Sequence, residues 1–199
     1  MDFNTENKLF DWARGFVVDL DKNTGLSPQI ETGARYLSQM KGAFHDEEAE
    51  KALLAAGDPV IYEFHRNQSR GTQGDLIFGC SIIQPGKVGD EYHMTKGHFH
   101  SPADICEVYY CIGGEGYMML ENEAGDWSCL ALHDCQVCYV PKGYAHRLIC
   151  TGDTPFVVFF VNHAECGQNY GAIETKGFHK LLVERDGRPA IIDNPKWAE

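Results

Sequence analysis

From Val60 onward the chain is a succession of short apolar runs, each followed by a turn that contains glycine or proline. The runs are rich in β-branched and aromatic residues and recur about every ten residues, which is the pattern of strands joined by tight turns. Such a series predicts an all-β sandwich or barrel. The predicted strands are VIYEFHR, LIFGCSII, EVYYCI, GYMMLE, WSCLAL, QVCYVP, HRLICT, PFVVFFV and KLLVE, and GRPAIIDNPKWAE predicts a last strand followed by a tail.

Residues 1–59 have a different texture and predict a helical or irregular extension. Asp46 followed by EEAEKALLAA predicts a capped helix with acidic residues in its first turn, which ends at Gly57-Asp58-Pro59. The segment Ile30–Met40 predicts a second short helix or an irregular arm. We expect this extension to pack on a barrel with a C-terminal strand and tail, residues 60–199. A chain of 199 residues that is 43% hydrophobic fits a single domain overall.

The composition limits the partners and the compartment. A formal net charge of −12 argues against nucleic acid and anionic membranes as partners, although a pocket can still be locally positive. No apolar run reaches the length of a membrane span, and the start, MDFNTENKLF, has neither the basic nor the apolar part of a signal peptide. We therefore expect a cytoplasmic protein whose eight cysteines are reduced and behave as small hydrophobes.

Four side chains have the spacing of a metal site. His98 and His100 leave the same face of a strand. Glu107 lies in an apolar strand-like run, where an ionised carboxylate needs a compensating charge or a metal. If its strand returns antiparallel beside the histidines, and His146 closes the set, three imidazoles and one carboxylate suit Fe, Mn, Ni, Co or Zn better than Ca or Mg. The alternative is that the histidine pair is solvated and binds no ion.

The longer strings around these residues resemble the cupin-type phosphoglucose isomerases. His98, His100, Glu107 and Gly114 are spaced as in the first cupin motif, and PKGYAH is similar to the second. TKGHFH, EVYY, VPKGYAHR, CGQNYG, KGF and DNPKW extend the resemblance from about Val60 to Trp197. It implies a cupin jelly-roll barrel (a double-stranded β-helix), a homodimer, and reversible conversion of glucose 6-phosphate and fructose 6-phosphate. It also implies one divalent ion per chain, Fe(II) in the first place, with Mn(II), Ni(II) or Zn(II) as alternatives.

The resemblance also implies roles for individual residues. Glu107 and Tyr170 are the implied catalytic residues, and Tyr109, two residues beyond Glu107, is expected to share the barrel interior. Asn162 stands where a tyrosine is common, and Gln168 where relatives have a histidine. The implied metal ligands are His98, His100, Glu107 and His146, and the implied substrate contacts are Tyr62, Ser81, Thr95, Gly97, Tyr109 and Tyr170.

The implied reaction moves a hydrogen between C1 and C2 of an open-chain sugar. A divalent ion would stabilise the charge of an enediolate, and Glu107 or a water beside it would carry the proton. A metal-assisted hydride shift would need no such base. Two other functions stay open, a cupin dioxygenase and a non-catalytic cupin that binds a sugar or a metal. The physiological metal, activity on mannose 6-phosphate, the effect of Asn162 and Gln168, and the dimer contacts are not determined by the sequence.

Overall fold

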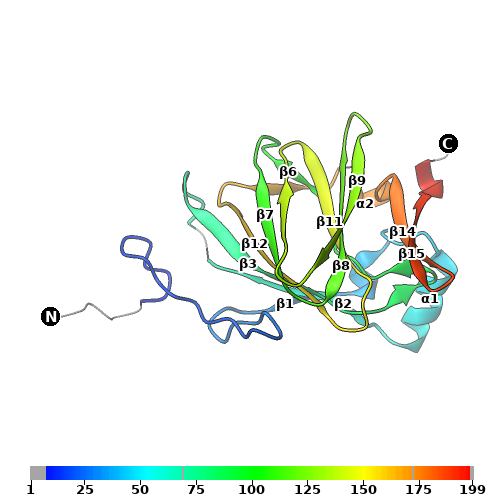
Figure 1. Ribbon diagram of the computed structural model, residues 1–199, viewed down its shortest axis with the longest axis horizontal. Helices are drawn as coiled ribbons and strands as arrows, with labels where there is room; N and C mark the ends of the chain where they lie inside the picture. The colour runs from blue at the N-terminus through cyan, green and yellow to red at the C-terminus, as the bar shows by residue number, and fades with distance from the viewer. Residues whose placement is uncertain (1–7, 69, 172, 198–199) are drawn as a thin grey trace.

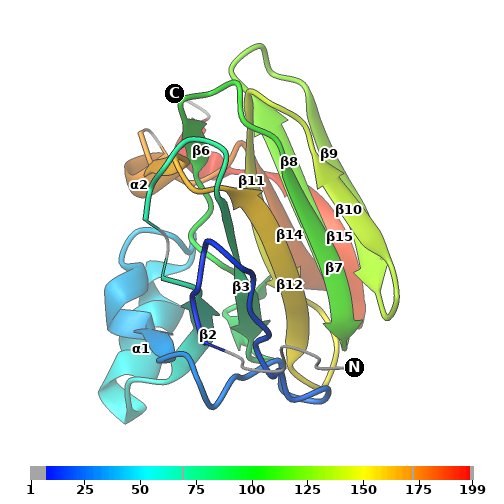
Figure 2. The same cartoon turned by 90° about the vertical axis from the view of Figure 1, so that its left-hand side faces the viewer.

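The strands pair into two antiparallel layers that face each other (Figures 1 and 2). A computed structural model describes residues 8–68, 70–171 and 173–197. The first layer is a six-stranded sheet in the order β1-β2-β3-β12-β7-β10. Its strands are β1 Gly33–Tyr36, β2 Val60–Arg66, β3 Leu76–Ile83, β12 Phe156–His163, β7 Glu107–Gly113 and β10 Val137–Val140.

The second layer consists of three smaller sheets joined by isolated bridges. Its centre is β11-β8-β9, and the pair β13-β6 joins it where His98 bridges His146. The sheet β15-β14-β5-β4 adjoins through the bridge between Met94 and Ile149. The strands are β4 Lys87–Val88, β5 Glu91–Tyr92, β6 Phe99–Ser101, β8 Glu115–Asn122, β9 Trp127–His133, β11 Tyr144–Cys150, β13 Gly167–Asn169, β14 Lys180–Arg185 and β15 Arg188–Asp193.

The order of the strands makes this a jelly roll. The chain changes layer from β7 to β8, returns from β9 to β10, crosses again from β10 to β11, and returns from β11 to β12. As a result β7 lies between β12 and β10 in one layer, while β8 lies between β11 and β9 in the other. This double-stranded winding is the jelly-roll arrangement of cupins. The predicted fold class is confirmed, and each of the predicted strands is present within a few residues of its expected bounds.

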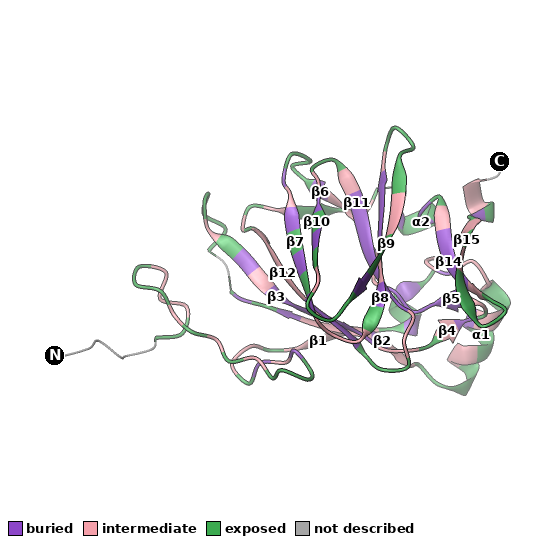
Figure 3. Ribbon diagram, viewed as in Figure 1, coloured by how far each residue is buried: buried purple, intermediate pink, exposed green. Residues whose placement is uncertain are grey.

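Alternation along the strands separates interior from surface (Figure 3). On β7, Glu107, Tyr109 and Cys111 are buried, whereas Val108 and Tyr110 are exposed. This period of two is what a pleated strand with one covered face requires. Side chains from both layers fill one end of the barrel with apolar contacts, and they leave the part around Glu107 as the polar region.

The N-terminal extension contains the predicted helix and an unpredicted strand. Helix α1 (Glu47–Ala56) begins at Asp46, whose side chain accepts a hydrogen bond from the Ala49 amide at 2.9 Å, and it ends at Gly57. The expectation of a helix or irregular arm for Ile30–Met40 is wrong for its middle part, because Gly33–Tyr36 forms β1 and pairs with β2. The short sequence GARY does not alternate between apolar and polar residues, so its pairing with β2 in the structure is what identifies it as a strand. A 3₁₀ turn, Leu37–Met40, follows.

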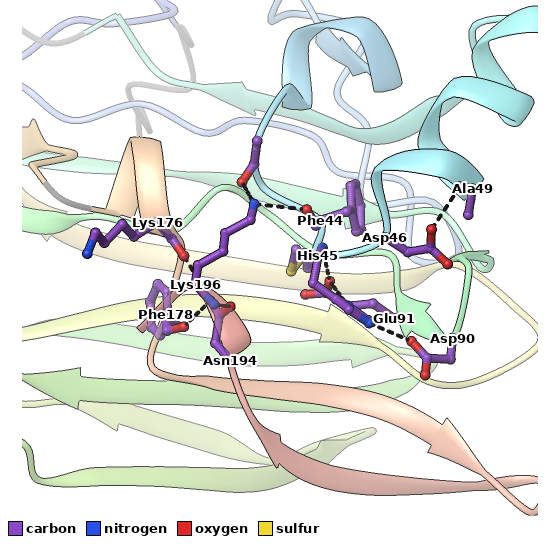
Figure 4. A network of polar contacts seen from close by, with 12 residues as sticks. Phe44, His45, Asp46, Ala49, Asp90, Glu91, Lys176, Phe178, Asn194 and Lys196 are labelled. Carbon is purple, nitrogen blue, oxygen red and sulfur yellow. Dashed lines mark hydrogen bonds and ion pairs between the residues drawn. The ribbon is translucent and has the colours of Figure 1, made fainter. Parts of the chain in front are cut away.

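The C-terminal tail ties the extension to the second layer. The tail follows helix α2 (Ile173–Lys176), β14 and β15, and it ends in a 3₁₀ turn, Pro195–Trp197. In Figure 4, Lys196 Nζ donates to the Gly42 and Phe44 carbonyls at 2.6 and 3.0 Å. Asn194 Nδ2 donates to the Lys176 and Phe178 carbonyls at 2.8 and 2.7 Å. None of the described helices is long and apolar enough to cross a lipid bilayer.

Replacing Lys196 with methionine tests this tie. We expect Lys196→Met to lower the free energy of unfolding by about 2 kcal/mol, because two partly buried carbonyls lose a charged donor. Lys51→Met is the matched control, since Lys51 makes only an exposed ion pair with Glu48 and its loss is expected to cost less than about 0.5 kcal/mol. Urea unfolding followed by circular dichroism measures both. Equal losses in the two variants would contradict a structural role for the tail.

Candidate active site

Three histidines meet where β6 and β11 run side by side. The His98 amide donates to the His146 carbonyl at 3.3 Å and the reverse bond is 3.2 Å, so the two backbones are directly opposed. His100 is two residues farther along and shares the face of His98. The ring centroids of His98 and His146 are 4.8 Å apart, and those of His100 and His146 are 4.9 Å apart. One ring nitrogen from each histidine lies within 4.8 Å of the others, as the spacing predicted.

Glu107 reaches this cluster from the opposite layer. The prediction that its strand returns beside the histidine strand is wrong, because β6 pairs with β13 and bridges to β11, whereas β7 pairs with β10 and β12. The carboxylate instead crosses the barrel interior. Its Oε2 atom lies 3.0 Å from Nε2 of both His100 and His146. The four side chains therefore lie together as expected, but Glu107 comes from the facing sheet and not from a strand paired with the histidine strand.

Burial and hydrogen bonds together shift the pKa values of the clustered side chains. Burial alone would raise the pKa of Glu107, but contacts with His100 and His146 outweigh it and lower the pKa, so the carboxylate is ionised. Burial, together with the neighbouring His146, lowers the pKa of His98 to about 3, so this imidazole is neutral. Burial would also lower the pKa of His100, yet hydrogen bonds with Cys166 and Glu107 raise it to about 10.

The donor set fits a divalent metal. Three imidazoles and one carboxylate converge here, and such nitrogen and oxygen donors would suit a divalent ion of the Fe, Mn, Ni, Co or Zn class. His146 Nε2 is buried, and although it lies close to Glu107 it makes no hydrogen bond with a described residue. His100 Nδ1 contacts the Ile105 carbonyl at 2.9 Å, which fixes the ring with Nε2 toward the cluster, as second partners of metal-binding histidines do.

A cavity of about 260 Å³ adjoins the cluster. Of the predicted site residues, all of which the structure describes, only His100 does not line it. Tyr109 is fully buried, and burial followed by the charge of Glu107 raises the pKa of its phenol well above the usual value, so it stays neutral. The predicted residues that line the cavity are Tyr62, Ser81, Thr95, Gly97, His98, Glu107, Tyr109, His146 and Tyr170.

Several residues that line the cavity were not among the site residues predicted from the sequence. Arg35, Arg66 and Cys166 line the cavity, yet nothing in the local sequence marks them. Arg35 lies on β1, so only a correct prediction of that strand would have indicated that Arg35 reaches the cavity. Lys96 also lines the cavity, with its Nζ 5.9 Å from the Tyr170 ring centroid. These cations make the cavity locally positive within an acidic chain.

Arg147 braces the cavity wall from behind. It follows His146 on β11, so its side chain points away from the barrel interior. On that outer side of the strand it is still fully buried by neighbouring segments. Its Nη2 donates to the Lys96 carbonyl at 2.7 Å, and its guanidinium carbon lies 4.2 Å from the Phe178 ring centroid. Burial lowers the pKa of Arg147 to about 10, which leaves it charged at neutral pH. The charge therefore holds the backbone segment that carries Thr95 and Gly97.

Gly97 fits this wall for two reasons. Its φ of +74° lies in the left-handed region, and a Cβ atom there would come within 2.7 Å of Phe178 and 3.0 Å of the Arg147 side chain. Thr95, two residues earlier, accepts a hydrogen bond from the Leu148 amide at 3.0 Å through its hydroxyl. Its hydroxyl proton remains available to a ligand.

Comparison with known proteins identifies the family. A family model of glucose-6-phosphate isomerase matches residues 34–196, most of the chain. The chain belongs to the glucose-6-phosphate isomerase family. A glucose-6-phosphate isomerase of Thermococcus litoralis is 43% identical over 182 residues, which cover 92% of this chain and 96% of the relative. Another, from Pyrococcus furiosus, is 40% identical with the same coverage, and a putative glucose-6-phosphate isomerase of Rhizobium meliloti is 36% identical over 96% of this chain and 89% of its own length.

An alanine at Gly97 separates backbone strain from packing in this family member. Gly125 has a φ of +91° with open space around it, so Gly125→Ala is the matched control and should cost about 1–2 kcal/mol. Gly97→Ala should cost about 1–3 kcal/mol more, because Phe178 and Arg147 must move. Urea unfolding of both variants measures the difference. Equal costs would show that φ alone requires the glycine.

Proposed function

We propose that this chain catalyses the reversible isomerisation of glucose 6-phosphate and fructose 6-phosphate with a divalent metal. The observation that carries the proposal is that one cavity joins a metal donor set to a wall of hydroxyl groups and cations. In a chain of the glucose-6-phosphate isomerase family, these two ends suit the two ends of a sugar phosphate, the reacting carbons and the phosphate.

The strand order supports this division of the cavity. Along the six-stranded sheet, Glu107 stands on β7, whereas Ser81, Tyr62 and Arg35 stand on β3, β2 and β1. β12 separates β7 from β3, and Ser81 pairs with Val158 whereas Glu107 lies beside Asn162, so the two residues are also offset along the strands. This separation supports different roles for the two regions of the cavity. We propose that Tyr62, Ser81, Thr95 and Gly97 hold the phosphate, with Arg35 and Lys96 supplying positive charge.

His98, His100, Glu107 and His146 would hold the metal. Imidazole and carboxylate ligands suit Fe(II), which we propose first, and also Mn(II), Ni(II) or Zn(II). When bound, such an ion supplies Lewis-acid stabilisation of negative charge on the substrate oxygens.

The chain's own groups position the sugar and manage the proton. Tyr170 is 6.0 Å from His98 between ring centroids, and we propose that it contacts the sugar near the reacting end. That hydroxyl donates to Gln168 Oε1 at 2.7 Å. The neutral phenol of Tyr109 faces Glu107 from within the barrel. In the proton-transfer route Glu107, or a water beside it, carries the proton between C2 and C1. In the hydride route Glu107 acts only as a ligand.

Isotope exchange separates these two routes. Substrate deuterated at C2 is converted in ordinary water, and the deuterium in the product is measured by mass spectrometry. Loss of label to solvent supports proton transfer, whereas retention of all label excludes it.

The proposed activity is tested by removing and restoring the metal. We expect purified protein to lose isomerisation of fructose 6-phosphate after chelation and to regain it with Fe(II), Mn(II), Ni(II) or Zn(II), also without oxygen. His98→Ala should lower turnover at least a hundredfold while the protein stays folded, whereas His133→Ala on the exposed face of β9 should not. Activity that resists chelation, or a folded metal-bound protein that does not turn over the sugar, would contradict the proposal.

The homodimer and the cytoplasmic location remain predictions that follow from the resemblance and the sequence. Light scattering after size-exclusion chromatography tests the first, and fractionation of cells tests the second.

A further inference from the structure

Asn162 lies beside Glu107 on the neighbouring strand. In the register of β12 and β7, Val161 pairs with Val108, so the next residue along β12 flanks Glu107. Asn162 Nδ2 donates to Glu107 Oε1 at 3.3 Å. The other oxygen, Oε2, faces His100 and His146. The two oxygens of this carboxylate therefore have different partners, one on each side.

The chemistry of the carboxylate fixes which way the Asn162 amide points. An ionised carboxylate only accepts hydrogen bonds, so the NH₂ group and not the carbonyl oxygen must face Glu107. The carbonyl oxygen is then turned away from Glu107. Asn162 Oδ1 is buried, lacks a hydrogen-bond partner among the described residues, and belongs to a side chain that lines the cavity.

A buried acceptor left in this state is costly. An unsatisfied polar group costs about 1–3 kcal/mol, so one beside a ligand cavity calls for an explanation. The cavity beside Asn162 is where the proposed substrate would lie, and an open-chain sugar phosphate offers several hydroxyl donors. Such a hydroxyl would satisfy Oδ1, which is covered in this structure, once the side chain turns slightly toward the cavity.

We propose that Asn162 connects the metal-binding carboxylate to the substrate. Its Nδ2 holds Glu107 with Oε2 toward the imidazoles, and its Oδ1 accepts a hydrogen bond from a hydroxyl of the sugar phosphate. The second half rests on the proposed function, whereas the first half depends only on the metal site. Tyr109 is a further donor toward Glu107, so the loss of Asn162 should weaken the site without abolishing it.

The test uses Asn162→Leu, which has nearly the same shape but cannot form hydrogen bonds. The control is Gln84→Leu, which removes a bond of the same kind, from Gln84 Nε2 to Glu63 Oε2 at 3.0 Å, outside the cavity. Mn(II) binding to the chelated full-length proteins is measured by calorimetry. We expect Asn162→Leu to bind Mn(II) about tenfold or more weakly, as loss of a group that orients a metal ligand does, and Gln84→Leu to match the wild type.

The second readout is KM for fructose 6-phosphate at saturating metal. We expect a rise of about tenfold or more in Asn162→Leu and none in the control. Unchanged Mn(II) affinity overturns the positioning of Glu107, and unchanged KM overturns the substrate contact. If Asn162→Leu does not fold, Asn162→Thr replaces it, because threonine suits a strand and is one bond too short to reach Oε1. A wild type that binds Mn(II) but does not isomerise the sugar would refute the proposed function, and Mn(II) binding would still test Asn162.

Discussion

The burial of one carboxylate organises this barrel. Glu107 is almost fully inaccessible to solvent, and an unpaired charge there would be very unfavourable. Its Oε2 atom contacts His100 and His146 across the interior, and Asn162 donates to its other oxygen from the same sheet. Each of these contacts constrains the relative position of two strands. The polar cluster therefore fixes the spacing of the two layers as well as a ligand set.

The jelly-roll topology explains why the donors come from both layers. The chain crosses between the layers after β7, after β9 and after β10, and these crossings put Glu107 on β7 and His146 on β11 in facing sheets. A site built in this way lies between two rigid surfaces. The brace formed by Arg147, Phe178 and Gly97 adds a buried cation behind one wall and keeps the backbone near the cavity.

Charge is distributed unevenly over the molecule. The chain carries a formal net charge of −12, yet Arg35, Arg66 and Lys96 gather around one cavity. An anionic small molecule is attracted to this cavity, whereas an extended polyanion meets a repulsive surface elsewhere. This contrast suits the small anionic substrate that we propose.

The sequence by itself determined the features that depend on residues close together in the chain, such as the strands, the ends of a helix and the spacing of two ligands. Apolar runs between turns with glycine or proline located the strands, Asp46 and Gly57 bounded α1, and the two-residue spacing placed His98 and His100 on one face. The tertiary structure alone decided that Glu107 crosses between layers, that Gly33–Tyr36 adds Arg35 to the sheet edge, and that Asn162 flanks Glu107. The physical reason is that periodicity and capping are local, whereas strand pairing joins residues far apart in the chain and is selected by the packing of the whole barrel.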